Sequence, residues 1–364
     1  MTILRKETDG SRKYLRVWFL RIPYETTAAE GGRRLKIGPF CIPYQFFQKN
    51  DWIYLKLWRL CLPWGRVRPG RRERHFQERE KLTTEYCIRL LQEELAGELG
   101  YRPNIIDPQS FNEKILWMKF FYHDPLITVC CDKYSVKQYV AQTVGGKYVL
   151  PTLAVWEDPA KIDFSHMPEQ FVLKVNWSSG YNIIVRDKRE LDFAAAAAQL
   201  AEWMRPKRNS YYDTFNWGYK NMRPVCYAEP YIEQCDGQVY DYKFFICNGR
   251  FEFMFVATDR SDKETLTHDF FDADFHLLPF TYGHRKHTAP PPSRPEHYDE
   301  MVELSLKLAK PFPFVRVDFY EAGGRVYVGE MTFYPGGGTL GFDPVKWDYE
   351  LGRKIQLPKK REVN

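Results

Sequence analysis

Apolar and polar positions alternate most regularly in the segment FVRVDFYEAGGRVYVGEMTFYPGGG, residues 314–338. Its first run is apolar at every second position and carries Arg316 and Asp318 in between, and its second run leads to Glu330. This alternation, interrupted at residues 322–324, predicts a β-hairpin. Two carboxylates on adjacent strands with an arginine beside them suit a Mg²⁺-nucleotide site, although acids on antiparallel strands also form plain solvated sheet faces.

The length of the hairpin loop decides on which face these side chains lie. A two-residue Gly323-Gly324 loop would send Glu330 to the face opposite Asp318, because a shift of one residue reverses every side chain of a strand. A three-residue loop at 322–324 would pair Arg316 with Glu330 and keep all three side chains on one face. The metal-site hypothesis therefore requires the three-residue loop.

Other periodicities predict helices and further strands. Apolar residues at helical spacing predict a helix over 75–99 that stops at Gly100, and Ser110-Phe-Asn-Glu113 is a capping box that opens a helix reaching Tyr122. The remaining predicted elements are a helix that Asp132 caps and that ends at 145–146, strands at 171–176 and 182–186, a helix at 191–204, strands at 225–233, 240–247 and 250–257, and a helix from near 295 to near 310. This order fits an α+β chain with two sheet-bearing lobes.

At 364 residues the chain is long enough to bury a large core in more than one lobe. Its longest apolar runs fall short of the roughly 20 residues that span a bilayer, and its first residues lack the apolar core of a signal peptide. We therefore expect a cytoplasmic protein. The eight cysteines form no CxxC pair and no Cys/His ligand spacing, which indicates reduced thiols instead of zinc sites or disulfides.

Positive charge is concentrated at the N-terminal end, where residues 1–81 hold 19 Lys and Arg against 8 Asp and Glu. Residues 15–24 and 35–44 repeat an apolar run that closes on Ile-Pro-Tyr and predict two strand-like units. Residues 50–75 interleave tryptophans with arginines, which suits a helix at an anionic membrane surface, or a helix packed on the main domain with a basic tail. We expect no nucleic-acid partner, because no nucleic-acid module accompanies this charge.

Five segments follow one another along the chain in a recognisable order. They are SFNEKILWMKFF (110–121), DPLITVCCDKYSVKQYV (124–140), FVLKVNWSSGYNIIVRDK (171–188), DYKFFICNG (241–249) and the hairpin segment 314–338. In this order they resemble the ATP-grasp fold, and specifically the TupA-like ATP-grasp family found with teichuronic acid and other cell-surface polysaccharide genes. The resemblance covers about residues 101–357. It implies two α+β lobes clasping ATP, at 101–228 and 229–364, after a basic N-terminal extension at 1–100.

The resemblance also implies roles for individual residues. Those implied to bind ATP are Lys133 and Lys174 at the phosphates, Ser178, Ser179 and Gly180 in a mobile phosphate lid, Glu229, Tyr231 and Ile232 in the hinge beside the adenine, and either Asp241 or Glu233 at the ribose. Those implied to act on the reacting groups are Asp318, Glu330 and Thr332 as Mg²⁺ ligands, Lys243 and Arg260 near the phosphoryl group and the acceptor, Arg316 at the reaction intermediate, and Pro335, Gly336, Gly337 and Gly338 at a carboxylate.

Two positions depart from the pattern of many ATP-grasp ligases. Thr332 stands where those enzymes have the asparagine of Glu-x-Asn, and a hydroxyl is a poorer Mg²⁺ ligand than an amide oxygen. The pattern therefore supports a first Mg²⁺ ion better than a second. Trp177 makes the lid loop bulkier than a Gly/Ser lid, and a hydrophobic anchor is the alternative role for it.

Three functions are compatible with these residues. The first is ligation of a carboxylate (a uronic acid, glycan or amino acid) to an amine through an acyl phosphate, in bacterial surface-polysaccharide biosynthesis. The second is phosphotransfer to a sugar hydroxyl, which needs a general base that no spacing reveals. The third is a nucleotide-binding adaptor of a polysaccharide assembly, against which the intact set of Lys174, Arg316, Asp318 and Glu330 argues. The histidines, His268 among them, match no catalytic spacing and are expected to be surface or packing residues.

Overall fold

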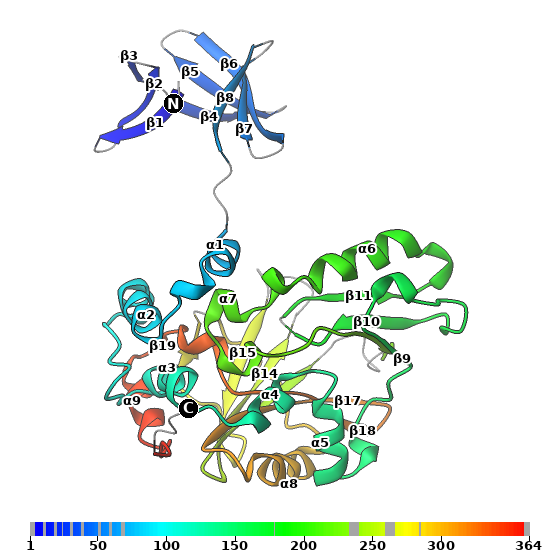
Figure 1. The fold of residues 1–364 in the computed structure, drawn as a ribbon. Helices are drawn as coiled ribbons and strands as arrows, with labels where there is room; N and C mark the ends of the chain where they lie inside the picture. Colours follow the sequence, from blue (N-terminus) through cyan, green and yellow to red (C-terminus); the bar gives the residue numbers. More distant parts are fainter. Residues whose placement is uncertain are drawn as a thin grey trace. The chain divides into compact units, whose positions relative to one another are not determined.

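The chain divides into two compact units, residues 1–70 and 71–364, drawn in Figure 1. The computed structural model describes residues 70–359 except 178, 233–239, 259–265 and 284, and between residues 4 and 66 it describes the backbone of the strands. All of the residues predicted to form the site belong to the larger unit.

The N-terminal unit consists of antiparallel strands. The first sheet contains β1 (Leu4–Asp9), β2 (Arg12–Val17) and β3 (Leu20–Pro23), and the second contains β4 (Glu25–Ala29), β5 (Gly32–Ile37), β6 (Phe40–Lys49), β7 (Trp52–Leu57) and β8 (Leu60–Arg66). The two strand-like units predicted at 15–24 and 35–44 are hairpins, and a third hairpin follows in the same register. Equivalent pairs are Leu15 with Ile22, Leu35 with Ile42 and Leu55 with Leu62.

The helix predicted within 50–75 is wrong, because β7 and β8 occupy residues 52–57 and 60–66. Trp52, Ile53 and Tyr54 open β7, and aromatic and β-branched residues favour extended backbone when neighbouring strands supply hydrogen-bond partners. The tryptophan and arginine pattern therefore belongs to a third copy of the hairpin repeat. A sequence comparison at a spacing of about 20 residues reveals this copy.

In the larger unit, the first sheet is antiparallel with strand order β11-β10-β12-β9. Its strands are β9 (Ala154–Trp156), β10 (Phe171–Val175), β11 (Asn182–Val185) and β12 (Cys226–Pro230). Alternate residues of β10 are buried, and α6 (Phe193–Trp203) packs on this strand. Lys174 therefore lies on the opposite face, together with Tyr227, its partner on β12.

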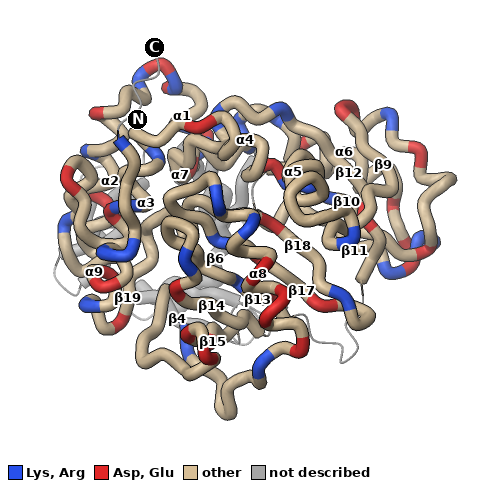
Figure 2. Tube along the Cα trace, turned by 90° about the horizontal axis from the view of Figure 1, so that it is seen from below, with Lys and Arg blue, Asp and Glu red and all other residues tan. Residues whose placement is uncertain are grey.

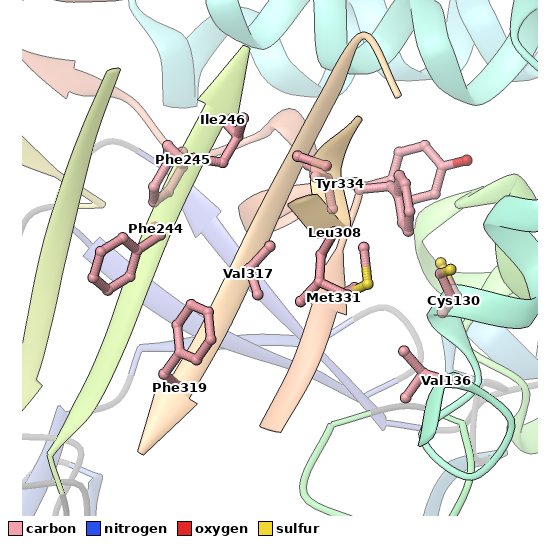
Figure 3. Close-up of a cluster of buried hydrophobic side chains, with 14 of the residues drawn as sticks. Cys130, Val136, Phe244, Phe245, Ile246, Leu308, Val317, Phe319, Met331 and Tyr334 are labelled. Carbon is pink, nitrogen blue, oxygen red and sulfur yellow. The ribbon is translucent and has the colours of Figure 1, made fainter. Parts of the chain in front are cut away.

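The second sheet is also antiparallel, with strand order β15-β14-β13-β17-β18. Its strands are β13 (Asp241–Cys247), β14 (Arg250–Thr258), β15 (Thr267–Phe271), β17 (Phe314–Ala322) and β18 (Arg325–Thr332). Apolar side chains of one face are seen in Figure 3, which labels Phe244, Val317, Phe319 and Met331 on neighbouring strands. Helix α8 (Tyr298–Ala309) packs on β17, β13 and β14, so the charged residues that alternate with these apolar ones lie on the other face.

The remaining described α-helices and strands are α1 (Arg71–Gln77), α2 (Thr84–Leu99), α3 (Phe111–Phe121), α4 (Pro125–Cys131), α5 (Val136–Thr143), α7 (Tyr211–Thr214) and α9 (Lys346–Gly352), together with β16 (Thr281–Tyr282) paired to β19 (Phe342–Asp343). The capping box at Ser110 and Glu113 is confirmed. The single helix predicted over 75–99 is wrong: Thr83 caps a separate helix, α2, by accepting the Tyr86 N–H.

Candidate active site

The β17–β18 hairpin turns through two residues, Gly323 and Gly324. Ala322 pairs with Arg325 directly before and after this turn, and both glycines have positive φ angles, 57° and 68°. Such backbone suits glycine, because a Cβ is disfavoured in the left-handed region. The predicted three-residue loop is therefore wrong.

A β-bulge at Gly329 brings the acidic residues to one face despite the short loop. The register shifts between Asp318 and Phe319, so that Asp318 pairs with Glu330. One extra residue on one strand restores the side-chain phase that the two-residue turn would otherwise reverse. A Cβ at position 329 would lie 2.9 Å from Cε1 of Tyr320, so the packed ring leaves room for glycine only.

Asp318 is buried between two cations on the cleft-facing side of the sheet. Arg316 donates Nε and Nη2 hydrogen bonds of 2.6 Å to its two carboxylate oxygens, and Lys243 Nζ lies 2.5 Å from Oδ2. Lys243 also lies 3.1 Å from Asp241. Burial raises the pKa of Asp318, whereas Arg316 and Lys243 oppose this shift by stabilising the carboxylate.

Glu330 connects the second sheet to the loop before α5. Its Oε2 forms an ion pair with Lys133 Nζ at 3.0 Å, and its Oε1 lies 3.2 Å from Arg316 Nη2. The Lys133 ammonium holds the pKa of Glu330 well below its ordinary range, although burial opposes the shift. Arg316 also donates a 3.0 Å bond to the Thr332 hydroxyl. Figure 2 shows acidic and basic segments close together around β17, β18 and α5.

A buried amide fixes the position of Lys133. The Lys133 backbone N–H donates to the carbonyl of Asn176, directly after β10, at 3.0 Å. The Asn176 side chain donates to Asp132 Oδ2 at 2.7 Å and accepts the Val225 N–H at 2.9 Å. Because Asn176 is fully buried, these bonds tie the loop of Lys133 to the ends of β10 and β12.

On the first sheet, Glu229 lies between two lysines. Its Oε2 is 2.5 Å from Lys174 Nζ and its Oε1 is 2.6 Å from Lys137 Nζ. Burial works against the ionised form of Glu229, but the two ammonium groups lower its pKa below the ordinary value. Both lysines thus have their charge held in place next to the cleft.

These residues line one cleft of about 370 Å³ between the charged faces of the two sheets. The predicted site residues that line it are Lys133, Lys174, Ser179, Gly180, Glu229, Tyr231, Ile232, Asp241, Lys243, Asp318 and Glu330. Arg316 donates a hydrogen bond to Asp318 and Thr332 donates one to Glu330, so both residues contact side chains that line the cleft. Of the two ribose candidates, Asp241 lines the cleft. Ser178, Glu233 and Arg260 lie outside the described residues.

The predicted carboxylate turn lines a different pocket. Gly336 and Gly337 border a cavity of about 530 Å³ together with Lys119. Lys119 is buried and donates to the Gly337 and Thr214 carbonyls at 2.5 and 2.9 Å. Burial lowers the pKa of Lys119 to about 7. Pro335 and Gly338, at the two ends of this turn, are buried.

A model of the TupA-like ATP-grasp family matches residues 113–356. The chain belongs to this family. None of the curated proteins matches the chain. Solved structures that are similar include D-alanine–D-alanine ligase from Bacillus anthracis complexed with ATP, at 16% identity and TM-score 0.38, covering 62% of this chain and 64% of that chain. Another is the L-amino acid ligase from Bacillus licheniformis, at 12% identity and TM-score 0.39, covering 71% of this chain and 55% of that chain. This ATP-grasp chain thus spans less than two thirds of the length of either ligase.

The donor set of this ATP-grasp chain fits a Mg²⁺ ion that is shared with a nucleotide. Among the described residues, no three His, Cys, Asp or Glu side chains are grouped so as to hold a metal alone. Asp318 and Glu330 supply two adjacent carboxylates, and Mg²⁺ is commonly held by one or two carboxylates with phosphate oxygens and water completing the shell. Thr332 offers only a hydroxyl that already bonds Arg316 and Glu330.

Sequence reasoning missed several residues in or beside the cleft. Lys137 contacts the lining residue Glu229, which it shares with Lys174, and its signal was a second lysine four positions after Lys133. Arg186 and Tyr320 line the cleft as well, and Tyr320 follows Asp318 by two positions on the same strand face. None of the helices in the described part of the chain is long and apolar enough to cross a membrane.

Proposed function

We propose that this protein is an ATP-dependent carboxylate–amine ligase. One observation carries the proposal: Lys174 of the first sheet and Lys133 of the loop before α5 line a single cleft together with Asp318 and Glu330 of the second sheet. Cations for phosphate oxygens and carboxylates for a hard metal ion are then available in the same cleft. Membership of the TupA-like ATP-grasp family supports the same reading.

The proposed lobes are residues 101–228 and 229–364, with the boundary within β12. Lys133 and Lys174 would hold phosphate oxygens, and the Ser179-Gly180 loop would cover them. Gly180 has φ 78° and no heavy atom within 4 Å of an added Cβ, so this loop backbone is open to a ligand. Tyr231 and Ile232 would lie beside the adenine, and Asp241 at the ribose.

In the proposed reaction, the substrate carboxylate attacks the γ-phosphorus of ATP and forms an acyl phosphate, and ADP leaves. Arg316 and Lys243 would stabilise the negative charge that develops on the transferred group and on the tetrahedral intermediate. Mg²⁺, held by Asp318 and Glu330 when bound, would neutralise phosphate charge. The amine then attacks the acyl carbon and phosphate leaves. We propose a uronic acid, glycan or amino acid of bacterial surface polysaccharide as the carboxylate.

The test is hydroxamate formation. The full chain is incubated with Mg²⁺, ATP and hydroxylamine together with D-glucuronate, D-galacturonate or each common amino acid in turn. We expect a hydroxamate, ADP and inorganic phosphate from one carboxylate class, since hydroxylamine traps acyl phosphates. A stable phosphorylated hydroxyl group on the sugar, with ADP but no free phosphate, would instead identify a phosphotransferase.

We further propose that residues 50–75 hold the protein peripherally at the cytoplasmic face of an anionic membrane. Vesicles rich in phosphatidylglycerol should sediment with the full chain more than with residues 71–364, which form a compact unit alone. Added salt should weaken this binding, because each cation near the surface contributes about 1 kcal/mol through a screened interaction. Equal and negligible sedimentation of both proteins would contradict the proposal.

A further inference from the structure

The loop between β10 and β11 is attached to helix α6 at both of its ends. At its beginning, the Trp177 ring is buried and its Nε1 donates a 3.0 Å hydrogen bond to the carbonyl of Trp203, the last residue of α6. At its end, the Tyr181 ring stacks on that of Trp203, with 5.2 Å between the ring centroids and 3° between the planes. The Tyr181 carbonyl also accepts the Val175 N–H at 3.0 Å. Trp203 thus holds both ends of this loop.

Arg72 on α1 holds the hydroxyl group of Tyr181. Its Nη1 donates a 2.6 Å hydrogen bond to Tyr181 Oη and a 3.0 Å bond to the Arg208 carbonyl, and its Nη2 pairs with Asp213 Oδ2 at 3.2 Å. Helix α1 packs against α7, which carries Asp213 (Figure 1). A planar guanidinium presents its donors in a fixed fork, so one side chain can make these three contacts together. Arg72 therefore joins α1 and α7 to the end of the β10–β11 loop.

Tyr181 connects this contact to the proposed nucleotide site. It lines the cleft of about 370 Å³ together with Lys174, Ser179 and Gly180. Gly180 directly precedes it, and its backbone is open to a ligand. A loop that is ordered before its ligand arrives loses less conformational entropy on binding. Holding the Tyr181 side chain therefore favours binding of a ligand by the Ser179–Gly180 backbone.

We propose that Arg72 is a positioning residue for nucleotide binding, which holds Tyr181 and so orders the Ser179–Gly180 backbone at the ATP phosphates. This proposal rests on the nucleotide site of the function proposed above. Arg72 is not among the residues that line the cleft, so it acts through Tyr181. It also lies outside residues 113–356, which the family model matches. A helix that precedes the ATP-grasp region thus contributes to the affinity for ATP.

A positioning role and a merely structural role differ in their ligand dependence. A contact that only stabilises the fold would, when lost, weaken every ligand of the cleft alike or none of them. A contact that orders the Ser179–Gly180 backbone affects ligands with phosphate groups, because a nucleoside has no phosphate for this backbone to bind. The comparison of a nucleotide with its nucleoside therefore separates the two roles.

The test measures ligand affinity in the full-length Tyr181→Phe protein. This change removes the oxygen that accepts from Arg72, keeps the ring on Trp203 and leaves the net charge unaltered. Isothermal titration calorimetry with Mg²⁺ and AMP-PNP should show a dissociation constant raised about tenfold, which is the lower end for loss of a hydrogen bond to a charged group. Adenosine, which has no phosphate, should bind with unchanged affinity. Arg72→Met should give the same two results.

A double variant tests whether Arg72 acts through Tyr181. The protein with both Arg72→Met and Tyr181→Phe should bind AMP-PNP as weakly as Arg72→Met alone, because both changes break the same contact. Multiplied effects of the two changes would overturn the proposed route. The matched control is Arg89→Met, since Arg89 is exposed on α2 and lies 5.9 Å from the Tyr86 ring centroid. This control also removes one positive charge, and it should bind AMP-PNP like wild type.

Two further outcomes would overturn the positioning role and leave the ligase function intact. One is an equal loss of affinity for AMP-PNP and adenosine in the Tyr181→Phe and Arg72→Met proteins. The other is an unchanged affinity for AMP-PNP in both. A wild-type protein that binds no AMP-PNP contradicts the nucleotide site itself, and the role of Arg72 falls with it.

Discussion

Replacing Glu330 by glutamine is expected to reduce hydroxamate-coupled ADP release by about 10³-fold or more. The change removes a carboxylate from the proposed metal site, and a metal ligand contributes several kcal/mol of charge stabilisation to phosphoryl transfer. It also removes the carboxylate that lies 3.0 Å from Lys133 Nζ. The Lys133 ammonium, which is proposed to hold a phosphate oxygen, is then no longer fixed in position. Steady-state ADP release and binding of Mg²⁺ with a non-hydrolysable ATP analogue measure the two effects.

A matched glutamate outside the cleft provides the control. Glu303 on α8 is exposed and pairs with Lys307 one turn later, so Glu303→Gln should have wild-type rates. Circular dichroism should show the same fold for both variants. Retention of more than a tenth of the wild-type rate by Glu330→Gln would contradict the assignment of Glu330 as a metal ligand.

Replacing Glu229 by glutamine is expected to lower the free energy of unfolding by about 3 kcal/mol. Removing one partner of a buried ion pair leaves an uncompensated buried charge, which costs about 3–5 kcal/mol. The lower end applies because Lys174 keeps 30% of its side chain exposed, whereas Lys137 keeps 15%. Urea unfolding at pH 7 measures the change. ATP binding should weaken as well, because Lys174 loses the carboxylate that orients it.

The pH dependence of this difference provides a second test. The pKa of Glu229 is lowered in the folded protein, so its stabilising contribution is fully present above about pH 5 and is lost as the pH falls through the folded pKa. The two proteins should therefore converge in stability under acid conditions. Glu202 is the control, since it too pairs with two cations, Arg205 and Arg208, but at the surface. Glu202→Gln should therefore lower the free energy of unfolding by less than about 1 kcal/mol. A Glu229→Gln protein as stable as wild type at pH 7 would contradict the stabilising role of the Glu229 carboxylate between the two lysines.

The local sequence determined several elements of the larger unit because their signals are short-range. The capping box at Ser110 and Glu113 needs only residues three positions apart, and the helix begins as predicted. The alternation around Val315 and Phe319 needs only the period of a strand, and it assigned Arg316 and Asp318 to the face opposite the apolar core. The family resemblance then ordered these elements into two lobes.

The tertiary structure decided what depends on contacts between distant residues. The bulge at Gly329 restores the face of Glu330 by packing against Tyr320 on the neighbouring strand, and a strand pattern contains no signal for that contact. Lys137 acquires its place only when α5 and β12 meet at Glu229. Local periodicity thus determined the faces of Arg316 and Asp318 on β17, whereas the pairing of strands decided the face of Glu330 and which side chains meet across the cleft.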